Sequence, residues 1–212
     1  HIEQVKITIP EGWTVIQISE YLTSKVVGFN SKEFLELAKK EEGFLFPETY
    51  FISPFATSGK LVATLRDGFD TRVSDIDTIK NSKRSLKEII TMASIVEAEG
   101  RTTESRKIIA GILWKRLDIG MRLQVDATFS YINGKNTYEL TADDLKIDSP
   151  YNTYVYKGLP PGPINNPGLD SIEATLYPTT SDYLYFYSSK DGEMYYGKTY
   201  EDHKKNIATH SN

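Results

Sequence analysis

The chain has 212 residues, a formal net charge of −4 and no cysteine, which excludes disulfide bonds, thiolate nucleophiles and thiolate metal sites. The acidic balance, with no run of more than two basic residues, argues against a general nucleic-acid binder, because such proteins carry a concentrated basic face. The three histidines lie at positions 1, 203 and 210, so acid–base chemistry falls mainly to carboxylates, tyrosine or lysine.

Membrane insertion is not expected from these residues. No stretch approaches the roughly 18 to 20 apolar residues that a membrane-spanning helix needs. Because the chain opens with His1 rather than Met, we interpret it as a processed or engineered fragment, so the absence of an anchor or targeting segment from these residues says little about the natural protein.

The first fifty residues predict a small βααβ unit. Residues 5–9 alternate apolar and polar, as in a strand, and Thr14 with Gln17 three residues later predicts a capped helix start. A second helix is expected over residues 31–40 and a second strand over 49–52. The run 9–22 resembles the opening of a LysM-type, glycan-associated module, although residues 43–50 depart from the usual LysM ending. The alternative is a spacer or packing unit.

In the rest of the chain, the predicted secondary structure changes at Gly120. Before it, helical patterns cover residues 58–80, 85–99 and about 103–119, and Gly120 suits a helix C-cap. After it come short strands and loops, with a hairpin predicted around Asp191-Gly192. We therefore expect an α+β fold. A LysM-like βααβ module at residues 1–55 precedes a larger domain at 56–212, with helices first and a β-rich C-terminal half.

Glu97 stands out on the helix predicted over residues 85–99. On a helical wheel the apolar residues of this helix fall within an arc of about 120°, and Glu97 lies inside that arc. Glu99 points about 160° away, on the flank. A carboxyl on an apolar face loses hydration, which favours the neutral form that a general acid needs. The alternative is a structural ion pair with one of four nearby arginines: Arg101, Arg106, Arg116 or Arg122.

Two further segments carry polar side chains suited to a cleft. The loop 149–168 contains five prolines, which make it rigid, and ten of the fourteen tyrosines lie between residues 151 and 200. Amides, hydroxyls and aromatic faces suit sugars, but a packed loop is the alternative. In the segment 121–128, an extended backbone would place three polar residues on one face: Gln124, Asp126 and Thr128. This face could line a cleft, or it could be the solvated face of an edge strand.

Taken in order, these stretches resemble the MltG (YceG-like) family of endolytic peptidoglycan transglycosylases. The resemblance is dense from about residue 45 to the C-terminus and rests on separated motifs that agree in order and spacing. The main motifs are Leu-Phe-Pro-Glu-Thr-Tyr (45–50), Met-Ala-Ser-Ile-Val-Glu-Ala-Glu (92–99), Ile-Gly-Met-Arg-Leu-Gln-Val-Asp-Ala-Thr (119–128), Pro-Tyr-Asn-Thr-Tyr (150–154) and Gly-Leu-Pro-Pro-Gly-Pro-Ile (158–164). Residues 166–168 and 183–186 add to them.

The resemblance implies specific site residues. The first glutamate of the Ala-Ser-Ile-Val-Glu-x-Glu motif, here Glu97, is expected to be the single catalytic acid/base. Ala98 stands where the family often has lysine. No metal and no cofactor are expected. The implied substrate-binding residues are Glu48, Gln124, Asp126, Asn152, Thr153 and Tyr154.

The implied reaction is cleavage of the β-1,4 bond between N-acetylmuramic acid (MurNAc) and N-acetylglucosamine (GlcNAc), giving 1,6-anhydro-MurNAc ends. The implied partners are peptidoglycan glycan strands and cell-wall synthesis proteins, with no nucleic acid. The implied location is the extracytoplasmic face of the bacterial cytoplasmic membrane, through an N-terminal anchor outside these residues. Three alternatives stay open. One is a hydrolytic muramidase with Asp126 or Glu48 as second carboxylate. The others are a catalytically silent glycan-binding module and a cell-wall scaffold.

Overall fold

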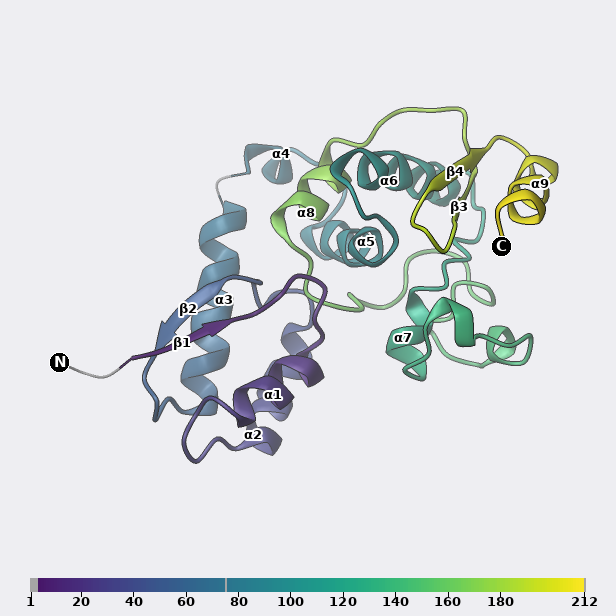
Figure 1. Cartoon of the computed structure of the whole chain (residues 1–212). Helices are drawn as coiled ribbons and strands as arrows, with labels where there is room; N and C mark the ends of the chain where they lie inside the picture. Colours follow the sequence, from purple (N-terminus) through teal and green to yellow (C-terminus); the bar gives the residue numbers. More distant parts are fainter. Residues whose placement is uncertain (1–3, 75, 212) are drawn as a thin grey trace. The chain divides into compact units, whose positions relative to one another are not determined.

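The computed structural model describes residues 4–74 and 76–211 (Figure 1), and the chain divides into two units. The first unit comprises the chain up to Ser94 together with Gly162–Leu169. The second comprises Ile95–Pro161 and the chain from Asp170 onward. The predicted boundary between residues 55 and 56 therefore lies inside the first unit.

The first unit begins with the expected βααβ order. Strand β1 (Val5–Thr8) pairs antiparallel with β2 (Thr49–Ile52). Between them in sequence lie α1 (Val15–Thr23), α2 (Ser31–Ala38) and a short 3-10 turn (Lys39–Glu41). The βααβ order is confirmed, and the likeness to a LysM module stays a prediction.

Helix α1 begins where the sequence predicts. The Gln17 N–H donates to Thr14 Oγ1 at 3.3 Å, and the Thr14 N–H donates to Gln17 Oε1 at 2.9 Å. Each side chain thus satisfies a backbone group that the first turn leaves without a partner. Val15, Ile18 and Leu22 are buried on one face, so the local cap sets the start and the apolar stripe sets the orientation.

Helix α3 explains why the first unit extends beyond residue 55. It covers Ser58–Ser74 and is followed by the short helix α4 (Asp77–Lys80). Leu61 and Leu65 are each 1% exposed and belong to the same hydrophobic cluster as Ile7 of β1. Burying a leucine side chain stabilises a fold by about 1.5–3 kcal/mol, so the βααβ elements and α3 share one core.

Glu42 is a buried carboxyl within this unit. Its Oε1 accepts hydrogen bonds from the Val15 N–H at 3.1 Å and from Asn166 Nδ2 at 3.0 Å. Asn166 comes from the returning segment 162–169, and its Oδ1 accepts from the Leu45 N–H at 2.9 Å. Burial raises the pKa of Glu42 to about 7, and the bonds from Val15 and Asn166 lower it in part.

Glu42→Gln is expected to flatten the pH dependence of stability. Between the ordinary carboxyl pKa of 4.5 and the folded value of about 7, the unfolded chain releases this proton and the folded chain keeps it. Stability is therefore lost as the pH rises through this window, by up to about 3 kcal/mol. Glutamine resembles the neutral acid, so the variant should lose less. Urea unfolding at pH 5 and pH 8 gives the free energy of unfolding at each pH. An equal loss of this free energy between pH 5 and pH 8 in both proteins would contradict the assignment.

Most of the regular secondary structure in the second unit is helical. Its α-helices and 3-10 turns beyond α5 are α6 (Thr103–Asp118), α7 (Thr128–Ile132), η2 (Thr137–Glu139), η3 (Asp144–Lys146), α8 (Leu169–Leu176, which starts at the unit boundary) and α9 (Tyr200–His210). Strands β3 (Tyr185–Ser188) and β4 (Met194–Gly197) form the predicted antiparallel hairpin. The α+β class is confirmed, but this hairpin is the strand content of the described C-terminal half, which holds less strand than expected.

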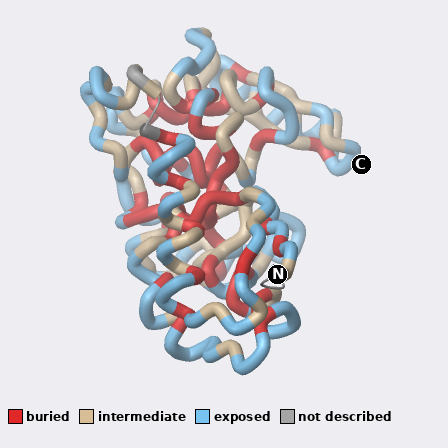
Figure 2. Tube along the Cα trace, turned by 90° about the vertical axis from the view of Figure 1, so that its left-hand side faces the viewer, coloured by how far each residue is buried: buried red, intermediate tan, exposed pale blue. Residues whose placement is uncertain are grey.

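Helix α5 (Leu86–Glu99) contributes residues to both units. Residues 89–96 are all buried (buried positions are red in Figure 2), whereas Glu97 and Glu99 are partly exposed and Ala98 is exposed. Its last turn is thus where the helix leaves the core. Of the helices that the structure describes, none is long and apolar enough to cross a membrane.

Candidate active site

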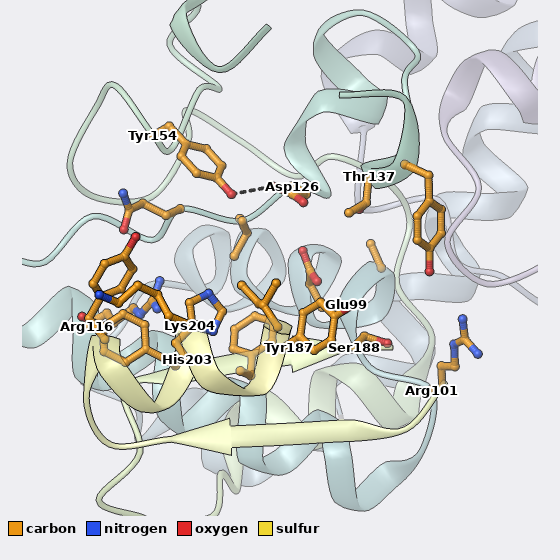
Figure 3. Close-up of a pocket in the computed structure, with 18 residues that line it drawn as sticks. Glu99, Arg101, Arg116, Asp126, Thr137, Tyr154, Tyr187, Ser188, His203 and Lys204 are labelled. Atoms are coloured by element: carbon orange, nitrogen blue, oxygen red, sulfur yellow. Dashed lines mark hydrogen bonds between the residues drawn. The ribbon is translucent and has the colours of Figure 1, made fainter. Parts of the chain in front are cut away.

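A cavity of about 510 Å³ lies in the second unit (Figure 3). Its walls come from the last turn of α5, the segment after α6, the strand β3 and helix α9. The ionisable side chains that line it, tyrosines apart, are Glu99, Arg101, Arg116, Asp126, His203 and Lys204. The aromatic lining residues are Tyr138, Tyr154, Tyr185, Phe186, Tyr187 and Tyr200. Carboxyls beside aromatic faces suit an uncharged polar substrate such as a sugar.

Glu99 is the carboxyl most altered by this environment. Its Oε1 accepts a hydrogen bond from the Ala127 N–H at 3.2 Å, while Oε2 accepts none from the residues that the structure describes. Burial raises the pKa of Glu99 to about 7, and the negative charge of Asp126 adds to the rise. The Ala127 N–H and the Arg116 guanidinium act in the opposite direction. Glu99 can therefore hold or release a proton near neutrality.

Asp126 and Tyr154 form a pair in the same cavity. Tyr154 Oη donates to Asp126 Oδ1 at 2.5 Å, the dashed line above Glu99 in Figure 3. Burial raises the pKa of Asp126, and the bond from Tyr154 lowers it. Burial, followed by the charge of Asp126, raises the pKa of the Tyr154 phenol. Tyr154 therefore stays a hydrogen-bond donor that fixes one oxygen of Asp126.

A strained backbone turn carries Gln124 and Asp126 into the cavity. Gln124 has φ of +49°, a left-handed conformation uncommon for a residue with a side chain. The Gln124 N–H donates to the Thr153 carbonyl at 3.2 Å, and the Val125 N–H donates to Thr153 Oγ1 at 3.0 Å. Strain held in place by surrounding bonds is common at functional sites. Gln124 and Asp126, which the sequence placed on one face, both line the cavity, whereas Thr128 is fully buried.

Asn152 and Thr153 lie behind the cavity wall and do not line it. Asn152 is fully buried, and its Nδ2 donates to the carbonyl oxygens of Leu145 and Ile147 at 3.1 and 2.8 Å. Its Oδ1 accepts from the Tyr154 N–H at 2.9 Å. Their polar groups are occupied within the protein, so they support the segments that carry Asp126 and Tyr154. Of the five predicted substrate-binding residues in segments 121–128 and 150–154, three line the cavity: Gln124, Asp126 and Tyr154.

Arg116 supplies a buried positive charge to the cavity. Its residue is 5% exposed, and its Nε donates to the Leu184 carbonyl at 2.6 Å. The Leu123 carbonyl accepts from Nη1 at 2.5 Å, and the guanidinium lies 5.0 Å from the centre of the Tyr185 ring. Burial lowers the pKa of Arg116, and the charge of Glu99 counteracts this. Arg116 thus opposes the negative charge that Glu99 carries after losing a proton.

His203 packs against the same tyrosine. Its ring is stacked on Tyr185 with ring centres 5.4 Å apart, and burial together with the charge of Arg116 lowers its pKa. The imidazole is therefore neutral at neutral pH. Its buried Nδ1 has no hydrogen-bond partner among the described residues. His203 and Tyr185 therefore both contribute aromatic rings to the cavity lining.

Glu97 has a different environment. Its side chain is 7% exposed and ion-paired to Arg106, whose Nη2 lies 2.7 Å from Glu97 Oε1. Ser171 Oγ donates to the other oxygen at 2.7 Å. Glu97 does not line the cavity. The burial that the helical wheel predicts is present, but the contact is the structural ion pair that the sequence left as the alternative, so the geometry does not favour Glu97 as the acid.

Glu48 lies in the first unit, where it is ion-paired to Arg72. It is not among the residues that line the cavity of the second unit. The role of second carboxylate, for which Asp126 and Glu48 are the candidates in sequence, is therefore favoured for Asp126.

Glu99, Arg116 and His203 were not predicted from the sequence as site residues. The helical wheel gave weight to the apolar face of α5, and Glu99 is on the opposite flank. The motif around residues 92–99 contains both glutamates, so the motif offered a signal, but it gives no reason to prefer the second without the cavity wall formed by residues 124–126.

Comparisons with known proteins agree with this architecture. The sequence pattern of the YceG-like family matches residues 1–209. An endolytic murein transglycosylase of Streptococcus pneumoniae is 42% identical over 178 residues, covering 81% of this chain and 32% of that protein. One of Bacillus subtilis is 34% identical over 228 residues, covering 94% of this chain and 63% of that protein. A crystal structure of a yceG-like protein from Listeria monocytogenes matches with a TM-score of 0.84 and 33% identity, covering 94% of this chain and 74% of that one.

The chain spans about a third of the length of the pneumococcal relative and less than two thirds of the Bacillus one. The family pattern covers both units, including the segments that build the cavity, and the fold match covers nearly the whole chain. The chain belongs to the YceG-like family.

Proposed function

We propose that this chain is an endolytic murein transglycosylase, with Glu99 rather than Glu97 as its single general acid/base. The observation that carries the proposal is a carboxyl with a pKa of about 7 on the wall of a cavity of about 510 Å³. An acid whose pKa lies near the working pH can both give and accept a proton efficiently. The names of the pneumococcal and Bacillus relatives support the activity.

The reaction needs two proton transfers by one group. Glu99 first gives its proton to the oxygen between MurNAc and GlcNAc, and the bond from this oxygen to the MurNAc C1 breaks. The GlcNAc 4-hydroxyl leaves. The Glu99 carboxylate then takes the proton of the MurNAc C6 hydroxyl, whose oxygen bonds to C1 and closes the 1,6-anhydro ring. Glu99 ends protonated, as it began, and no water is consumed.

Neighbouring groups suit each protonation state of Glu99. Before the first transfer, the charge of Asp126 and burial favour the protonated acid. After it, Arg116 and the Ala127 N–H stabilise the carboxylate. Asp126, held by Tyr154, is the group that we assign to the developing positive charge on the sugar ring. Gln124 is assigned to a substrate hydroxyl or amide, and Asn152 and Thr153 to support of these residues.

Because Asp126 is a second carboxyl in the cavity, a hydrolytic muramidase is the second candidate function. Asp126 lines the same cavity as Glu99, and its charge acts on Glu99. Two carboxyls flanking one bond are the arrangement that ordinary glycoside hydrolysis uses, with one of them activating water or attacking the sugar. Cleavage by water would then give reducing ends. The lyase is favoured because a single group near its working pKa satisfies both transfers.

Mass spectrometry of the products from purified peptidoglycan strands separates these functions. The transglycosylase should give muropeptides that end in 1,6-anhydro-MurNAc, from the wild type and not from Glu99→Gln. Reducing ends that carry one added water would establish the muramidase. Retained glycan binding without products would indicate a binding module or scaffold. The proposal includes peptidoglycan glycan strands as the substrate and a location outside the cytoplasmic membrane. Contacts with cell-wall synthesis proteins stay a prediction.

A further inference from the structure

Arg106 of α6 binds both sides of the turn that carries Glu99. Its Nη2 lies 2.7 Å from Glu97 Oε1, and its Nε donates to the Gly100 carbonyl at 3.1 Å. Its Nη1 lies 2.6 Å from Asp170 Oδ2 at the start of α8. The Arg106 side chain is 14% exposed, and its guanidinium joins the end of α5 to α8 through three separate groups. A planar fork with fixed donor directions suits such bridging, which lysine cannot reproduce.

These contacts fall on the residues that flank Glu99. Helix α5 ends at Glu99, and the last carbonyls of a helix lack partners within the helix. Arg106 supplies one such partner at Gly100, directly after Glu99. It also holds Glu97, whose second oxygen accepts from Ser171 Oγ at 2.7 Å. The last turn is thus fixed on the side away from the cavity.

Gly100 permits the close approach. A Cβ built at this position would lie 2.6 Å from Arg106 Cγ and 3.1 Å from the Arg106 backbone. Any larger residue at position 100 would push α6 away from the end of α5. Glycine is therefore needed at position 100 because it lacks a Cβ and lets Arg106 approach closely, not because the backbone turns there.

The turn has two functional sides. Ala98, Glu99 and Arg101 line the cavity, whereas Glu97, Gly100 and Arg106 do not. The Glu97, Gly100 and Arg106 contacts, which we call the α5 clamp, therefore act without touching substrate. Because Glu99 Oε1 must meet the Ala127 N–H from another segment, a rotation of this turn would break that bond and admit water.

We propose that Arg106 is a positioning residue for the proposed reaction, which through the α5 clamp holds the Glu99 carboxyl against the Ala127 N–H and beside Asp126. The inference rests on the proposed function of Glu99. It gives Glu97 a role as the charged partner of Arg106.

Arg106→Gln should lower kcat by about 10- to 100-fold, because small displacements of a reacting group are costly. KM should change little, since Arg106 does not line the cavity. The alkaline limb of the kcat profile should move to lower pH, because burial is the main cause of the high pKa of Glu99. Glu97→Gln keeps an oxygen for Arg106 and should retain most activity, while Glu97→Ala should resemble Arg106→Gln.

Trp114→Phe is the matched control. It removes the buried hydrogen bond from Trp114 Nε1 to the Thr175 carbonyl, 3.0 Å long, which also joins α6 to α8. That hydrogen bond does not involve α5. A purely structural role for Arg106 predicts that both variants lower the melting temperature and leave the pH limb in place, and that result would overturn the proposal.

Two measurements keep the test independent of folding and of turnover. Gly100→Ala keeps every charge and perturbs the same contact, so it replaces Arg106→Gln if that variant does not fold. Carbon-13 NMR of labelled glutamate follows the titration of Glu99 directly, with Glu99→Gln for assignment. A Glu99 titration unchanged in every clamp variant would refute the clamp. Full turnover in Glu99→Gln would instead refute the proposed function.

Discussion

Glu99→Gln is expected to lower kcat by about 10²- to 10⁴-fold, the contribution typical of a general acid or base. Glutamine keeps the size of the side chain and an oxygen for the Ala127 N–H, but it cannot transfer a proton to the glycosidic oxygen. Turnover is measured as the rate of anhydro-product formation from purified glycan strands.

Glu97→Gln is the matched variant, two residues away on the same helix. Its amide can accept from Arg106 and still contact Ser171, so it should retain most of the wild-type kcat. The reverse outcome, with Glu97→Gln inactive and Glu99→Gln active, would return the catalytic role to Glu97 as the sequence motif predicts.

Stability distinguishes loss of chemistry from loss of structure in Glu99→Gln. The pKa of Glu99 is raised from 4.5 to about 7 in the folded chain, so the wild type loses stability as the pH rises between these values. Glutamine removes that cost. The variant should therefore be inactive and, at pH 8, more stable than the wild type by up to about 3 kcal/mol, as urea unfolding can measure. A destabilised variant would indicate a structural Glu99.

Asp126→Asn is expected to shift the alkaline limb of the pH–rate profile to lower pH. The negative charge of Asp126 helps to raise the pKa of Glu99, so removing it favours the Glu99 carboxylate and leaves fewer molecules with a proton to donate. Above the limb, activity should fall by about tenfold for each pH unit by which the limb moves. Initial rates between pH 5 and pH 9 measure the shift.

The same variant separates the lyase from the muramidase. Asparagine can still accept from Tyr154 but lacks the charge assigned to the sugar ring, so Asp126→Asn should keep a lowered but measurable turnover at pH 5 if Glu99 is the single acid/base. A complete loss of turnover at every pH would instead assign Asp126 to a direct chemical step. Asp143→Asn is the control, because the Asp143 side chain is 94% exposed and does not line the cavity. It should leave the profile unchanged.

The local elements could be predicted because their causes lie within a few residues. The Thr14 and Gln17 side chains cap α1 from inside one turn. Gly120 ends α6 with φ of +70°, and the Met121 N–H closes the turn on the Arg116 carbonyl at 2.8 Å. The hairpin between β3 and β4 follows from its Asp191-Gly192 turn. In each case the deciding contact joins residues that are only a few positions apart in the sequence.

The extent of the first unit could not be predicted in this way. Leu61 and Leu65 of α3 pack into the same core as Ile7, although the boundary predicted from the βααβ pattern falls after residue 55. A hydrophobic stripe shows that a helix has a buried face. It does not show which element covers that face, because burial is not directional.

The sequence by itself determined the family, the α+β class, the βααβ order and a motif that contains both glutamates. Only the tertiary structure decided between them. Helical periodicity measures each residue against the apolar face of its own helix, and by that measure Glu97 is buried and Glu99 is not. The pKa of a carboxyl depends instead on the groups that other segments bring to it: Arg106 from α6 ion-pairs with Glu97, while Asp126 and Ala127 meet Glu99 in the cavity.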